Sequence, residues 1–154
     1  MLETRCREKL LKLQAEMIKT NINDFYIYQF DSGWKLVLAG SFDFNFCYYH
    51  DIEIEFIEVS FISCPVSLFK IDTIRLATEE ERKSISQLSR GYNEGIAFCL
   101  EHVAFNNTFY IVAKGIDYKL QRVYYLPKRT KPPWSSAAHS RSPATSLSTC
   151  ESSE

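Results

Sequence analysis

The run DIEIEFIEVSF at residues 51–61 decides the fold, because apolar and acidic side chains alternate along its first half in steps of two. Such alternation is typical of a β-strand with one face in the core and the other in solvent. Ile52, Ile54 and Phe56 are therefore expected to face the core, and the acids between them to face outward.

The alternation shifts by one residue after Phe56. Ile57, Val59 and Phe61 then share one side, so the apolar face continues only if the strand absorbs an extra residue. This shift predicts a β-bulge or a bend within the strand. Proline at position 65 is expected to end the strand, because it cannot donate to a ladder of hydrogen bonds.

The wider segment Leu36–Phe69 contains no lysine or arginine but holds eight aromatic residues. Its acids are Asp43, Asp51, Glu53, Glu55 and Glu58. A strand-forming segment that keeps its acids and lacks bases is expected to present an unbalanced negative surface.

Upstream, the apolar residues Leu2, Cys6, Leu10, Leu13 and Met17 recur at steps of three or four, which predicts a helix over residues 2–19. Two runs of period two follow, 25–30 and 34–39, joined by a glycine-containing turn at 31–33. Residues 41–49 alternate in the same way and predict a further half-buried strand.

Downstream, Thr78 and Glu81 have the spacing of a capping box, so a second helix is expected to begin there and to end at Gly91. Three strands are expected after it, over 96–105, 109–113 and 118–126, with turns at 106–107 and 114–115. The sequence thus predicts an α+β fold. A mostly antiparallel, twisted sheet of about seven or eight strands would carry the N-terminal helix, with the short second helix before the last three strands.

The composition fits one domain followed by a tail. The chain has 154 residues, of which 45% are hydrophobic and 24% charged, as in ordinary globular proteins. We expect a single α+β domain over residues 1–126. Residues 127–154 hold four of the five prolines and eight serines, so this tail is expected to be disordered.

Several classes of partner and cofactor are disfavoured. The N-terminal residues interleave charges with leucines, unlike a secretory signal or a membrane helix, and the five cysteines lack a CxxC spacing. We therefore expect a cytoplasmic protein with reduced thiols, no membrane association, no metal and no cofactor. The aromatic residues lie where bases are missing, so the 1–126 body is not expected to bind nucleic acid.

The residue pairs that could act in catalysis are poorly placed for it, because each lies on one expected strand. His50 next to Asp51 or Glu53 offers a base with an orienting carboxylate, but adjacent strand residues point to opposite faces unless a turn intervenes. Cys99 and His102, three residues apart on a strand, fail the same test as a thiol nucleophile and its base. Buried, inert cysteines are expected.

The first functional hypothesis is a small non-catalytic protein-binding module that docks a basic protein on an acidic, aromatic sheet surface. Bacterial immunity proteins share this physical character, although no sequence likeness is involved. The expected partner-binding residues are Tyr49, His50, Asp51, Glu53, Glu55 and Glu58. The alternative is a small enzyme or ligand-binding domain with a site around Asp43, Tyr49, His50 and Glu53. A third hypothesis is a homo-oligomer formed through the aromatic sheet.

Overall fold

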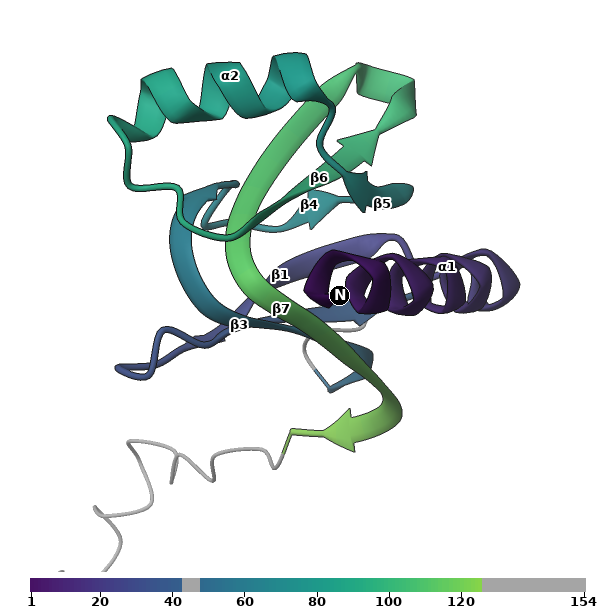
Figure 1. The fold of residues 1–154 in the computed structure, drawn as a ribbon. Coiled ribbons are helices and arrows are strands. Elements are labelled where there is room, and N and C mark those ends of the chain that lie inside the picture. Colours follow the sequence, from purple (N-terminus) through teal and green to yellow (C-terminus); the bar gives the residue numbers. More distant parts are fainter. Residues whose placement is uncertain (43–47, 126–154) are drawn as a thin grey trace, which may run out of the picture.

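The fold was obtained as a computed structural model that describes residues 1–42 and 48–125 (Figure 1). In chain order its elements are α1 (Leu2–Thr20), β1 (Asp24–Phe30), β2 (Leu36–Ser41), β3 (Tyr49–Ser63), β4 (Phe69–Lys70), β5 (Thr73–Leu76), α2 (Glu79–Ser89), β6 (Ile96–His102), the 3₁₀ helix η1 (Val103–Phe105) and β7 (Asn107–Tyr124). The strands form one antiparallel sheet in the order β4-β1-β2-β3-β7-β6-β5. This confirms the expected α+β fold.

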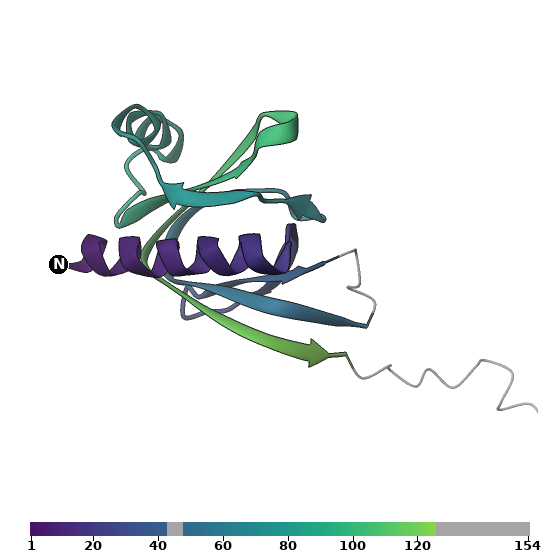
Figure 2. The ribbon, with the colours of Figure 1, turned by 90° about the vertical axis from the view of Figure 1, so that its right-hand side faces the viewer.

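The sheet is strongly curled, because the long strands β3 and β7 bend together around α1 (Figures 1 and 2). Helix α1 lies in the hollow, and α2 covers the other face at the β6 end. Among the described residues, no helix combines the length and the apolar character that crossing a membrane requires.

Two apolar clusters hold these layers together. In the larger one the predicted stripe of α1, including Leu10, Leu13 and Met17, packs on the inner face of the sheet. The smaller one joins Ile85 of α2 to the outer face of β6 and β7, where Cys99 and Val112 are fully covered. The face of the sheet that is opposite α1 is thus covered by a helix at one end.

The predicted bulge in β3 is confirmed, but the side chains around it occupy other faces of the sheet than expected. Glu58 adopts a left-handed backbone at φ 51°, and the register against β7 shifts between Val59 and Phe61. Val59 therefore packs in the larger cluster and Phe61 against the smaller one, while Ile57 is exposed. The expectation that these three side chains share one side was wrong, because the strand is irregular twice, at the left-handed Glu58 and at the register shift that follows Val59.

The strands expected over 109–113 and 118–126 are one element, β7. Lys114 and Gly115 continue the strand instead of turning, since Gly115 pairs with Ile57 of β3. The short strands β4 and β5 were not predicted, being only two and four residues long. Most of the strand expected over 41–49, and the whole tail 127–154, lie outside the described residues.

The capping box of α2 is present as predicted. The backbone N–H of Glu81 donates to the Thr78 hydroxyl at 3.3 Å, and the Glu81 carboxylate accepts from the Thr78 N–H at 2.6 Å. These bonds satisfy backbone groups that the first turn of a helix leaves without partners. They fix the start of α2 over the end of β5.

Replacing Thr78 with alanine is expected to lower the free energy of unfolding by about 1 kcal/mol, because a side-chain acceptor at the N-cap is lost. Urea denaturation followed by circular dichroism measures this difference. Thr78→Ser is the matched control, since it keeps the hydroxyl and should stay near the wild-type value. Equal stability of the alanine variant and the wild type would show that the cap contributes nothing.

Candidate functional site

The acidic row of β3 is paired with bases that come from outside the segment Leu36–Phe69. Salt bridges join Asp51 to Arg122 at 2.7 Å and Glu55 to Lys119 at 2.7 Å, and the carboxylate of Glu58 pairs with Lys114. These three bases lie on β7, the antiparallel neighbour of β3. The surface is therefore one of mixed charge, and the expected unbalanced negative field is absent from these described strands.

Glu55 has the most extensive pairing. Its carboxylate lies between Lys119 and Lys35, the latter at 3.2 Å, and its side chain is only 12% exposed. The hydrogen bond from Lys119 is the main cause that lowers the pKa of Glu55, and burial opposes it. Glu55 thus links β3 to β7 and to the residue that precedes β2.

His50 and Glu53 are brought together, although they are three residues apart on a strand. The pairing of β3 with β7 shifts register between His50 and Ile52, which changes the direction of neighbouring side chains. The His50 Nε2 lies 3.0 Å from Glu53 Oε1, and its Nδ1 lies 2.7 Å from the Tyr125 hydroxyl. The Tyr125 hydroxyl also bonds with that of Tyr26, so four side chains form one hydrogen-bonded chain.

This polar chain is closed to solvent at the histidine, whose exposed fraction is 0%. The rings of Tyr28 and Tyr125 lie against the imidazole, with centroids 4.9 and 5.5 Å away. Burial raises the pKa of Tyr125 and of Tyr26, so both phenols stay protonated at neutral pH. The arrangement is that of a satisfied structural network in which His50 is held by both ring nitrogens.

Asp51 and Tyr49 lie in a separate group. The Arg122 guanidinium that pairs with Asp51 lies 4.1 Å from the centre of the Tyr49 ring, and Tyr124 packs edge-on against that ring. Asp51 also lines a surface cavity of about 450 Å³ with Thr20 at the end of α1. Of the residues predicted to form a ligand site, His50 and Glu53 therefore lie together and Tyr49 lies apart from them, while Asp43 is outside the described residues.

A second polar cluster, which the sequence did not indicate, lies beneath α2. Arg75 of β5 donates from Nη1 and Nη2 to Glu81, both at 2.8 Å, and from Nε to Glu101 at 3.1 Å. The Tyr110 hydroxyl and the Cys99 thiol point at the same Glu81 oxygen, at 3.4 and 3.6 Å. The paired Arg75 guanidinium lowers the pKa of Glu81 to about 2.

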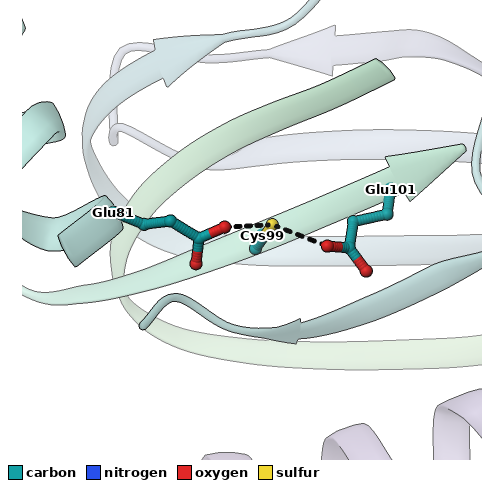
Figure 3. A group of neighbouring side chains, drawn as sticks. All are labelled: Glu81, Cys99 and Glu101. Atoms are coloured by element: carbon teal, nitrogen blue, oxygen red, sulfur yellow. Dashed lines mark hydrogen bonds between the residues drawn. The ribbon is translucent and has the colours of Figure 1, made fainter. Parts of the chain in front are cut away.

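Figure 3 shows Glu81, Cys99 and Glu101 side by side, with their ligating atoms within 4.8 Å of one another. Such a set could hold a metal ion, but the two carboxylates are already engaged by Arg75. Burial raises the pKa of the Cys99 thiol to about 12, so the thiolate that metals and nucleophilic chemistry require is scarce. The cluster is a network of ion pairs in which Arg75 connects Glu81 of α2 to the strands of the sheet.

Cys99 and His102 lie in different surroundings, as expected from their spacing on one strand. The His102 ring stacks on Phe105 at 5.0 Å and lies 3.9 Å from Asp72, while Cys99 contacts the glutamates under α2. Burial likewise raises the pKa of the Cys64 thiol to about 11, which favours its protonated form at neutral pH. None of the three described cysteines Cys6, Cys64 and Cys99 forms a disulfide.

An aromatic surface surrounds the β3 bulge. Trp34, in the turn between β1 and β2, is 62% exposed and has a left-handed backbone at φ 58°, an unfavourable conformation for a bulky residue. Its carbonyl accepts from the Val59 N–H at 2.7 Å, next to the bulged Glu58. Phe30 lies edge-on to the Trp34 ring, 6.5 Å away, and is half exposed.

Comparison with models of protein families, with curated proteins and with solved structures found no match to this chain.

Proposed function

We propose that this chain is a cytosolic, non-catalytic protein-binding module that docks its partner on the surface around the β3 bulge. The observation that carries the proposal is the exposure of Trp34 in a conformation that costs free energy. About 1–3 kcal/mol is the usual cost of such a residue, and it persists where the surrounding structure enforces it. Exposed tryptophan beside other aromatic side chains is typical of the residues that dominate binding energy in interfaces.

The charges around the bulge suit a specific interface. Glu58 pairs with Lys114, and Glu55 pairs with Lys35, which follows Trp34 in the chain. A surface with charges of both signs selects partners by local complementarity. We propose that Glu58 and Glu55 adjoin the aromatic contact and that Glu53 and Asp51 extend the charged row along β3.

A non-catalytic role is supported by the chemistry of the two polar clusters. His50 is covered by aromatic rings, and the tyrosines bonded to it have raised pKa values. The thiol beneath α2 has a raised pKa as well. The free cysteines agree with a reducing compartment, as we propose for a cytosolic protein.

The proposal is tested by capturing partners from the source cells with the full-length chain and measuring the affinity of whichever protein is retained. Replacing Trp34 with asparagine, which tolerates a left-handed backbone, should weaken that affinity at least about ten-fold. Leu11→Gln is the control, because Leu11 is 69% exposed on α1, far along the chain from the bulge. Affinity unchanged by Trp34→Asn, or lowered equally by both variants, would contradict the proposal.

The identity of the captured protein distinguishes a homo-oligomer from a complex with a different protein. A second copy of this chain would appear in light scattering as a doubled mass that Trp34→Asn removes, which is the homo-oligomer alternative. A different protein with exposed arginine or lysine side chains would match the basic partner expected from the sequence.

A further inference from the structure

A surface cavity of about 370 Å³ opens next to Trp34. Its lining comes from the turn between β1 and β2, from β3 just after the bulge, and from the loop that follows α2. The lining residues are Trp34, Val59, Ser60, Gly91, Tyr92 and Glu94. Trp34 and Tyr92 are 62% and 79% exposed, so two aromatic side chains stand at an open cavity.

The walls of this cavity are fixed by hydrogen bonds. The Trp34 N–H donates to the Asp31 carbonyl at 3.0 Å, and the Asp31 carboxylate accepts from the Gly33 and Lys35 N–H groups. On the opposite wall, the Ser60 hydroxyl donates to the Glu94 carbonyl at 3.0 Å. The backbone around Trp34 and Glu94 is thus held in place before any ligand arrives, which limits the ordering cost of binding.

The one charged residue among those that line the cavity is an acid. Glu94 lines the cavity, and Glu58 lies on the neighbouring bulge, bonded to Lys114. The hydrogen bond to Glu58 is the main cause that raises the pKa of Lys114, and the charge of Glu94 adds to it. A ligand that carries a positive charge could pair with the carboxylate of Glu94.

We propose that the cavity binds an arginine side chain of the protein partner, an inference that rests on the proposed function. A planar guanidinium can lie over the ring of a tryptophan or tyrosine while its N–H groups donate to a carboxylate. Trp34 and Tyr92 offer the rings, and Glu94 offers the carboxylate. An apolar side chain would cover the Glu94 carboxylate without pairing it, and an acidic one would be repelled by it.

The probe is acetyl-arginine amide, titrated into the full-length chain while the indole N–H signal of Trp34 is followed by NMR. Trp134→Phe makes Trp34 the only tryptophan, since the chain has two. We expect a saturable shift with arginine and at least about ten-fold weaker binding of acetyl-citrulline amide, which has the same shape without the charge. Glu94→Gln should weaken arginine binding about five-fold or more, whereas Glu8→Gln, the same change on exposed α1, should not.

Equal binding of arginine and citrulline amides, or an arginine affinity that Glu94→Gln leaves unchanged, would overturn the inference. The failure of this inference and that of the proposed function are separable. If Trp34→Asn abolishes capture of the partner but arginine amide does not bind, the docking surface stands without an arginine site. If arginine binds and capture survives Trp34→Asn, the site is real and the proposed function is wrong.

Discussion

Replacing Arg75 with methionine is expected to lower the free energy of unfolding by about 3 kcal/mol, near the lower end of what breaking a buried ion pair costs. Glu81 and Glu101 would lose their shared cation while lying within a few ångströms of each other, under α2. Methionine keeps much of the apolar stem of arginine, so the loss reports mainly the charge. The side chain of Arg75 is 33% exposed, so its loss is expected to cost less than that of a fully covered arginine. Urea denaturation at pH 7 measures it.

The same variant has a defined dependence on pH. Glu81 has a pKa of about 2 in the folded chain, below its ordinary value of 4.5, so its contribution to stability is complete above pH 4.5 and is lost as the pH falls toward 2. The difference in the free energy of unfolding between the wild type and Arg75→Met should therefore become smaller as the pH falls from 5 to 3. The triple variant Arg75→Met with Glu81→Gln and Glu101→Gln, which removes the repelling charges, should recover part of the stability. A difference that stays constant with pH would mean that lost packing, not lost charge, causes the effect.

The local features of the fold could be predicted from the sequence because each depends on neighbouring residues. The stripe of α1 follows from steps of three and four, and the inward set of β3 from steps of two. The bulge at Glu58 could be located because a core strand cannot change phase without an extra residue. The cap of α2 needs only Thr78 and Glu81.

The surface of the sheet could not be predicted in the same way. The charge of β3 depends on which strand lies beside it, and the bases of β7 are 56 to 71 positions away in sequence. A count of charges within one segment therefore misjudged the field of the folded molecule. The sequence pattern divides the long β7 at Lys114-Gly115 because glycine is common in turns, whereas cross-strand pairing with β3 overrides that preference.

The candidate site was identified only in part for a related reason. The sequence indicates both His50 and Glu53, but their contact depends on a register shift in β3. Tyr125 and Tyr26, far from them in the chain, complete the set of hydrogen bonds. The aromatic cavity likewise combines Trp34 with residues of the loop after α2. Two non-glycine residues with positive φ, Trp34 and Glu58, mark this place, and no periodicity in the sequence predicts the first of them.

Replacing His50 with leucine is expected to lower the free energy of unfolding by about 3 kcal/mol, because two hydrogen bonds are lost and their polar partners remain largely covered. Glu53 would keep a carboxylate that is only 20% exposed and has lost its imidazole partner. Thermal and urea denaturation measure the change. Tyr125→Phe, which removes one hydroxyl from the same chain of hydrogen bonds, should cost about 1 kcal/mol.

The His50 variants also separate a structural role from a functional one. His50→Gln can still donate to Glu53, so it should be less destabilised than His50→Leu. Because His50 is fully covered, a folded His50→Gln chain should bind the captured protein with the wild-type affinity. Loss of binding in that folded variant, with Trp34→Asn binding normally, would place the docking surface at the His50 network instead of the β3 bulge. The affinities of folded His50→Gln and Trp34→Asn, compared with each other, thus show which part of the curled sheet the partner contacts.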